Sequence, residues 1–236
     1  HWPNTPLTHG LDSTLGANPV RLDLYVRATG AGDTVALGEQ RKFTPLFPSY
    51  RSPLANLLGL RFIATGDPIE VIDKSLAGNP LPIRARTPSA IIYENPDALP
   101  RALFATRALP ADFDELLRSG KWPATDFETT VLLEESVKAS PPRRPGKIAI
   151  TDYRNAVVTL SVISPDGGWA VLNDVWHPWW QAEINGRKAP LLKANVLFRA
   201  VAVPPGHHTV TFRFKPLEGL FDLTSGNARA SPVPPS

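Results

Sequence analysis

The 236-residue chain contains no cysteine. This absence excludes disulfide bonds, zinc-thiolate sites, iron–sulfur clusters and cysteine nucleophiles. Methionine is also absent and the chain starts at His1, which predicts a fragment of a longer chain or a processed form. No apolar run approaches the roughly 18 to 20 residues that a membrane-spanning helix needs, and no signal peptide is recognisable. We therefore expect any targeting or anchoring segment to lie outside these residues.

The chain also lacks a large excess of either positive or negative side chains. The chain has 25 Lys and Arg against 22 Asp and Glu, a formal net charge of +3. So small a surplus, spread along the chain, does not indicate a nucleic-acid-binding surface, and we expect no nucleic-acid partner. Hydrophobic residues make up 42% of the chain, which is enough for a buried core. The 26 prolines are about twice the usual share and argue against long helices.

Residues 1–125 are expected to form a mixed lobe of short helices and strands. Helix starts are predicted where a capping side chain precedes proline or acidic residues, and helix ends where glycine follows. These signals predict helices from Asn18-Pro19 to Gly30, from Ser52-Pro53 to Gly59, and over 112–118 before Gly120. Strands are predicted at 60–64, 90–93 and 102–105. The proline-rich stretch 65–88 predicts short extended pieces and turns.

Residues 126–216 are expected to be an antiparallel β-sandwich, followed by a flexible tail over 217–236. The alternative is that the two lobes form one compact domain. Asn185-Gly186 predicts a tight two-residue hairpin. The predicted strands are 127–133, 147–153, 156–163, 169–173, 181–184, 187–193, 196–203 and 209–215. The fold class is therefore α+β and mainly β.

The densest aromatic segment runs from Trp176 to Trp180, with Asp174 just before it. Indole faces beside a carboxylate can stack on a sugar ring and bind its hydroxyls. The glycan-binding candidates are therefore Trp179, Asp174, Trp176 and His177. The alternative is that these aromatic side chains fill the core, because buried rings usually carry core energetics.

Strand alternation predicts a split between neighbouring tryptophans. Trp180 shares a side with Ala182 and Ile184, so we expect it to be buried. Trp179 has the opposite parity and is expected to be at least partly exposed. Trp176 precedes the proline turn, and alternation does not assign its side.

No nucleophile or phosphate-binding motif is present: G-x-S-x-G, the P-loop, G-x-G-x-x-G and H-E-x-x-H are all missing. His207-His208 is expected to be a solvated turn end, since adjacent strand residues diverge. We assign no catalytic residue, no metal site and no cofactor. Arg101 and Arg199 stand in largely apolar stretches, and an arginine there needs a carboxylate or carbonyl partner. A buried structural pair is predicted for each.

Three stretches resemble the YfhO-like bacterial membrane proteins. Residues 16–22 read GANPVRL, and residues 93–102 read YENPDALPRA, similar to that family's N-x-x-a-L-P-R-a segment. Over residues 171–216 the resemblance lies in WWQAEING (179–186), NVLFRAVAV (195–203) and PGHHTVTFRFKP (205–216). The order of the stretches matches, and they are spread over most of the chain. One departure is Pro178 before Trp179, where the family usually has glycine.

This resemblance implies a multi-spanning membrane protein of the lipid-linked-sugar glycosyltransferase type, of which this chain would be the extracytoplasmic C-terminal domain. The family's catalytic acids lie in loops between membrane helices, so this fragment is not expected to be catalytic. It implies a location at the bacterial cell membrane on the periplasmic side, with membrane attachment through a preceding part. The expected partner is a glycan or a lipid-linked sugar, and the fragment is expected to be a monomer. The alternatives are a stand-alone carbohydrate-binding β-sandwich module and a free periplasmic enzyme or copper protein.

Overall fold

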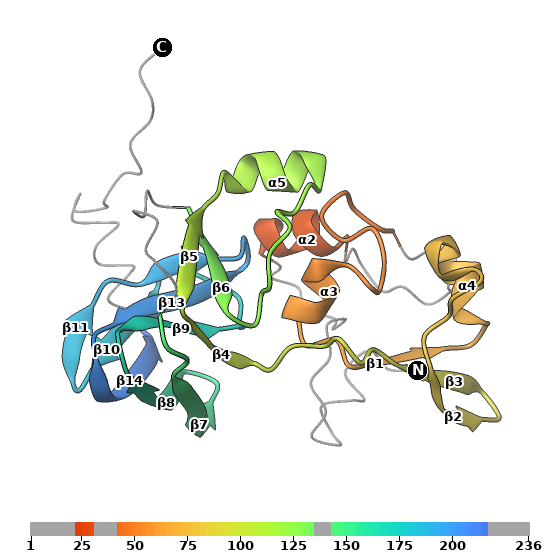
Figure 1. The fold of residues 1–236 in the computed structure, drawn as a ribbon. Helices are drawn as coiled ribbons and strands as arrows, with labels where there is room; N and C mark the ends of the chain where they lie inside the picture. The colour runs from red at the N-terminus through yellow and green to blue at the C-terminus, as the bar shows by residue number, and fades with distance from the viewer. Residues whose placement is uncertain (1–21, 31–41, 135–142, 217–236) are drawn as a thin grey trace, which may run out of the picture.

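The computed structural model describes residues 22–30, 42–134 and 143–216 (Figure 1). The described chain is mainly β, with several antiparallel sheets and short helices. The helices are α2 (Asp23–Thr29), α3 (Pro53–Leu57), α4 (Ile69–Ile72), the 3-10 helix η2 (Lys74–Leu76) and α5 (Phe113–Ser119). The tail prediction for 217–236 lies outside the described residues. No helix among the described residues is long and apolar enough to cross a bilayer.

The helix ends follow the predicted signals. Ser52 caps α3 by accepting a hydrogen bond from the Ala55 N–H at 3.4 Å, and Asp112 caps α5 in the same way through Glu115. Gly30 and Gly120 end α2 and α5 with φ of +66°, a backbone conformation that glycine adopts without strain. Asn18 and Pro19 lie outside the described residues, but the helix that was expected to start there begins only at Asp23, since Leu22 before it has an extended backbone.

The first sheet has three antiparallel strands in the order β1-β3-β2: β1 (Phe62–Thr65), β3 (Ala90–Glu94) and β2 (Ile83–Thr87). The extended pieces and turns predicted over 65–88 are found in part, since β2 lies there, but the helices α4 and η2 in the same stretch were not predicted. The cause is local hydrogen bonding. The buried Asp73 carboxylate accepts from the backbone N–H groups of Ser75 and Tyr50, which holds a tight helical turn.

Two larger sheets contain the rest of the strands. The six-stranded sheet has the order β4-β9-β13-β12-β6-β5, and the five-stranded sheet has the order β11-β10-β14-β8-β7. All pairs are antiparallel except β5 with β6. The strands are β4 (Ala102–Ala105), β5 (Arg107–Pro110), β6 (Thr130–Leu133), β7 (Lys147–Arg154), β8 (Val157–Ser164), β9 (Gly168–Leu172), β10 (Trp180–Ile184), β11 (Arg187–Ala189), β12 (Leu192–Ala194), β13 (Phe198–Val203) and β14 (Gly206–Phe214).

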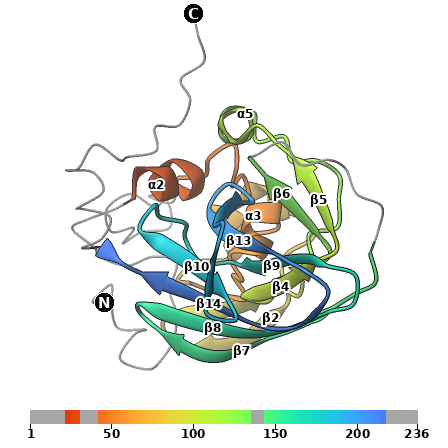
Figure 2. The same ribbon diagram turned by 90° about the vertical axis from the view of Figure 1, so that its left-hand side faces the viewer.

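One hydrophobic cluster combines side chains of both larger sheets, which lie close together in Figure 2. It takes Phe104, Leu172 and Val201 from the six-stranded sheet, and Leu160 and Phe212 from the five-stranded sheet. A second cluster joins α3 and α5 to residues 196–198, at the start of β13. The first half of the chain therefore shares a core with the second.

The hairpin at Asn185-Gly186 is confirmed, with φ of 51° and 76° at its two central residues. The single strand expected over 187–193 was wrong. Pro190 interrupts it, and the two halves, β11 and β12, belong to different sheets. The strand expected over 127–133 begins only at Thr130, because the Asp126 side chain forms a turn with the Glu128 N–H.

Candidate functional site

Two strands and the ends of two others bring four polar side chains together, which we call the Asp174 cluster: Arg101, Tyr153, Asp174 and Arg199. Arg101 Nη1 lies 2.5 Å from Asp174 Oδ1, and Arg199 Nη2 lies 3.2 Å from Asp174 Oδ2. The Tyr153 hydroxyl is 3.3 Å from both carboxylate oxygens and accepts a hydrogen bond from Arg101 at 2.8 Å. Arg101 directly precedes β4, Tyr153 is on β7, Asp174 follows β9 and Arg199 is on β13.

Arg199 is the most buried charge of this cluster, with 1% of its side chain exposed. It shares the side of β13 on which Val201 and Val203 enter the apolar cluster. Its guanidinium lies 3.8 Å from the centre of the Trp180 ring, and Nη1 donates to the Val175 carbonyl at 2.8 Å. Burial lowers the Arg199 pKa to about 10, while the Asp174 charge partly opposes that shift. Arg199 therefore stays charged at neutral pH.

The predicted buried pair is confirmed for Arg199, whereas Arg101 also pairs with a carboxylate but keeps 33% of its side chain exposed. Both arginines use the same carboxylate, that of Asp174. Burying a guanidinium without a counter-charge costs desolvation free energy. The Asp174 carboxylate offsets this cost at a site with little access to water. Asp174 therefore has a structural task, and a sugar hydroxyl binding there would share oxygens that already accept hydrogen bonds.

The other glycan-binding candidates lie just beyond Asp174, on the segment that enters β10. The His177 and Trp179 rings meet edge to face at 4.8 Å, and both contact Phe214 on β14, at 5.5 and 6.1 Å. We call His177, Trp179 and Phe214 the aromatic face. All three side chains are half-buried. The structure therefore brings Trp179 and His177 together and leaves part of each accessible.

His177 is held by its neighbours and by burial. Its Nδ1 accepts the Trp179 backbone N–H at 3.2 Å, and its carbonyl accepts the Trp180 N–H at 3.0 Å. Burial lowers the pKa of His177 below its ordinary value. The ring is therefore uncharged at neutral pH, which suits packing against aromatic rings.

Trp176 and Trp180 have other surroundings. The Trp176 ring lies 5.9 Å from the Lys193 ammonium, and its backbone N–H donates to the Leu197 carbonyl at 2.7 Å. Trp180 packs against the apolar cluster and Phe214 while its face covers Arg199. Trp180 is half-buried rather than fully buried, because it lies at the end of β10.

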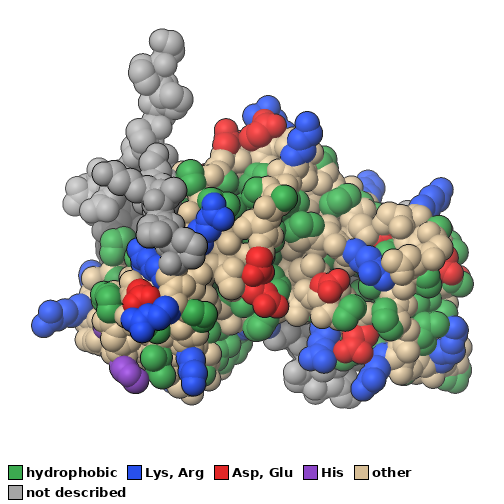
Figure 3. All heavy atoms as spheres, viewed as in Figure 1, with side chains coloured by type: hydrophobic (Ala, Val, Ile, Leu, Met, Phe, Trp, Pro, Cys, Tyr) green, Lys and Arg blue, Asp and Glu red, His purple; other side chains and the backbone are tan. Residues whose placement is uncertain are grey.

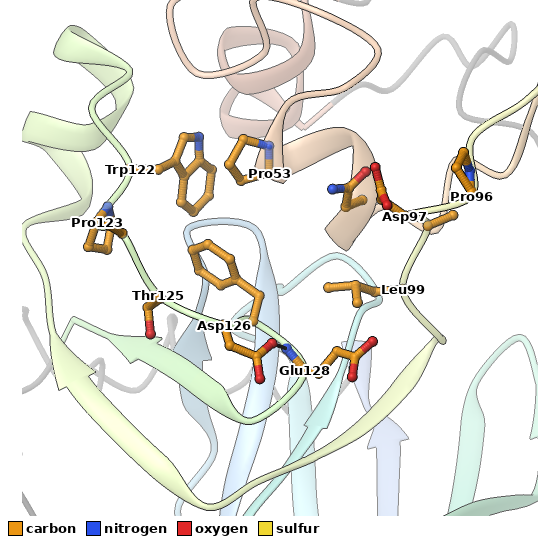
Figure 4. Close-up of a pocket in the computed structure, with 13 residues that line it drawn as sticks. Pro53, Pro96, Asp97, Leu99, Trp122, Pro123, Thr125, Asp126 and Glu128 are labelled. Atoms are coloured by element: carbon orange, nitrogen blue, oxygen red, sulfur yellow. Dashed lines mark hydrogen bonds between the residues drawn. The ribbon is translucent and has the colours of Figure 1, made fainter. Parts of the chain in front are cut away.

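Two features were missed from the sequence. Tyr153 gave no signal, since it is one of several polar residues on a mostly exposed strand. The other is a groove of about 570 Å³ between α3, residues 96–99 and residues 122–128 (Figure 4). Trp122 and Phe127 lie in a loop beside proline and acidic residues. This composition is the one feature of the sequence that could have indicated the groove.

His207 and His208 were expected at a turn end, but they lie in the first part of β14, paired with Ile163 and Val162 of β8. Both ring nitrogens of His208 have local partners: Nδ1 is 3.1 Å from Asn185 Nδ2, and Nε2 is 3.2 Å from the Pro205 carbonyl oxygen.

The chain was compared with protein-family models, curated proteins and solved structures, and it matches none of them.

Proposed function

We propose that this chain is an extracytoplasmic domain of a multi-spanning bacterial membrane protein of the YfhO-like type. Its role is accessory: it binds a glycan or the acceptor of a lipid-linked sugar, and it is not itself catalytic. The two larger sheets form a β-sandwich that displays the aromatic face at one end. The parent protein attaches the domain to the membrane and carries the glycosyltransferase chemistry.

One observation carries the proposal. The stretches that resemble the family are far apart in the sequence, yet residues from two of them meet at Asp174. Arg101 belongs to the YENPDALPRA stretch and Arg199 to the NVLFRAVAV stretch. In each stretch the arginine forms an ion pair with the Asp174 carboxylate, and this pair stabilises the fold. This convergence supports reading the short resemblances as one arrangement.

A glycan-binding role is supported by the aromatic face. Partly exposed indole and imidazole rings offer apolar surface to the C–H face of a pyranose, and polar groups at its edge accept or donate hydrogen bonds. Because Nδ1 of the neutral His177 ring accepts the Trp179 backbone N–H, the proton is on Nε2, which can donate a hydrogen bond to a sugar hydroxyl. The Asp174 cluster next to this face keeps the segment rigid, which lowers the entropy cost of binding.

The test is binding of the isolated domain to immobilised bacterial surface glycans. Trp179→Ala is the diagnostic variant, because Trp179 is accessible and is not among the core residues. We expect retention of at least one glycan class by the wild type and its loss in Trp179→Ala, with a melting temperature that falls by no more than about 5 °C. Wild-type protein that retains no glycan would refute the binding role.

The second candidate is a stand-alone carbohydrate-binding module, favoured by the same aromatic face. A parent gene encoding several membrane spans before His1 separates the two, since a stand-alone module has none.

A further inference from the structure

The groove seen in Figure 4 is built from three segments that are held together by hydrogen bonds. Asn95 Nδ2 donates to Asn56 Oδ1 at 2.8 Å, and the Leu99 N–H donates to the Asn56 carbonyl at 2.9 Å. These bonds fix residues 96–99 against α3. On the other side the Asp126 carbonyl accepts the Thr130 N–H at 2.9 Å, which fixes the loop before β6. The walls are therefore preorganised.

One wall of the groove is aromatic. Trp122 and Phe127 pack edge to face, with ring centres 5.4 Å apart and planes at 90°. The Trp122 indole N–H donates to the Leu46 carbonyl at 3.1 Å, which fixes the orientation of the ring. Both rings are half-buried, so part of each faces the groove. Pro53 and Pro123 extend this apolar surface (Figure 4).

All charged side chains that line the groove are negative. Asp97, Asp126 and Glu128 line the groove, and no Lys, Arg or His does. Asp126 is engaged by the Glu128 N–H and the Thr129 hydroxyl, both at 2.8 Å. The carboxylates of Asp97 and Glu128 make no hydrogen bond or ion pair with any other described residue. Acidic side chains are visible over the middle of the face shown in Figure 3.

These features select a class of ligand. Carboxylates accept hydrogen bonds and repel anions, so the ligand must donate hydrogen bonds and carry no negative charge. The aromatic wall requires an apolar face, and an ammonium group next to an aromatic ring gains further attraction. A metal ion fits less well, because no group of three His, Asp or Glu among the described residues is arranged to hold one. The volume of the groove holds a short oligosaccharide.

We infer that this groove is a second carbohydrate site, distinct from the aromatic face, and that it binds sugars bearing free amino groups. The inference rests on the proposed glycan-binding function and adds a ligand class to it. The sugar stacks on Trp122 and Phe127. Its ammonium and hydroxyl groups donate to Asp97 and Glu128.

The test uses the whole 236-residue chain and three trisaccharide probes that differ in charge: the glucosamine trimer, the N-acetylglucosamine trimer and the galacturonic acid trimer. Titration is followed by the Trp122 indole signal in ¹H–¹⁵N NMR spectra at low salt. We expect the glucosamine trimer to shift this signal in a saturable way. The N-acetylglucosamine trimer should bind at least fivefold more weakly, and the galacturonic acid trimer should leave the signal unchanged.

The double variant Asp97→Asn/Glu128→Gln should weaken binding of the glucosamine trimer about fivefold without changing the melting temperature, since both side chains are exposed. Asp152→Asn is the matched control. It also removes an exposed acid, but one paired with Arg154 on β7 and outside the groove, so it should leave binding unchanged.

Equal responses to the glucosamine and galacturonic acid trimers, or no saturable response to any trimer, would overturn the inference. Equal losses in Asp152→Asn and in the double variant would do so too. Trp179→Ala separates this result from the proposed function. It should abolish glycan retention at the aromatic face while the glucosamine trimer still shifts the Trp122 signal.

Discussion

Arg101 and Arg199, which are 98 positions apart in the sequence, bind opposite oxygens of one carboxylate, that of Asp174. Arg101 is at the start of β4, and Arg199 is in β13, which is separated from β4 by β9 in the same sheet. The carboxylate therefore ties the ends of three neighbouring strands together. The aromatic face begins three residues later, so the same interaction positions the segment that we propose contacts the glycan.

Removing this carboxylate should destabilise the fold. Asp174→Ala leaves Arg199 buried without a counter-charge, and breaking such a pair costs about 3–5 kcal/mol. Urea denaturation of the variant and the wild type measures the difference. Asp152→Ala, which breaks the exposed pair with Arg154, is the control and should cost less than about 1 kcal/mol. Similar values for the two variants would show that the Asp174 cluster is not a structural centre.

The two adjacent tryptophans should respond differently to truncation. Trp180 covers the Arg199 guanidinium and packs on the apolar cluster, so Trp180→Ala should cost about 3–5 kcal/mol. Trp179 touches only the edge of this core through His177 and Phe214, and its truncation should cost less than about 1.5 kcal/mol. Thermal and urea unfolding of both variants check this. A larger loss for Trp179→Ala than for Trp180→Ala would place Trp179 in the core instead.

Gly186 should be hard to replace although the space around it is open. Its φ is +76°, and an added Cβ would meet no atom within 4 Å, so any cost comes from the backbone conformation. Gly186→Val should cost about 1–3 kcal/mol. Gly66 also has open space, but its φ lies outside the left-handed region, so Gly66→Val is the control and should cost clearly less. Equal denaturation midpoints for the two variants would contradict the turn assignment.

His177 should titrate below the ordinary pKa of histidine. Burial lowers its pKa, so the folded state binds fewer protons than the unfolded state as the pH falls below about 6.5. The stability that depends on neutral His177 is therefore present above that pH and is lost as the pH falls through the folded-state pKa. NMR titration of the ring protons gives the midpoint directly. A midpoint at or above 6.5 would mean that the ring is hydrated and not packed against Trp179.

The helices and hairpin that depend on local signals could be predicted from the sequence. Ser52, Gly120 and Asn185-Gly186 each specify a cap or a turn through their own backbone preferences, and the structure has those features. The α4 and η2 turns could not be predicted, because they depend on Asp73 bonding to Tyr50, 23 residues away. The division of 187–193 between two sheets likewise depends on tertiary pairing.

For the candidate site, the sequence indicated which residues are unusual for their surroundings, but it did not indicate that they contact one another in the fold. Arg101 and Arg199 stood out because each is a charge in an apolar stretch, and Asp174 stood out beside the tryptophans. That all three meet depends on the order of β4, β9 and β13 in the sheet, which no local pattern encodes. The groove was missed for the same reason, since its three segments are far apart in the chain.

The central claim is that the domain binds glycan through the aromatic face. The most direct test is to titrate a glycan retained in the binding screen into ¹⁵N-labelled domain and to follow the indole signals of Trp179 and Trp122. The account predicts that a glycan without amino groups shifts the Trp179 signal in a saturable way and leaves the Trp122 signal in place. A Trp179 signal that stays unchanged while the glycan is bound would contradict the claim.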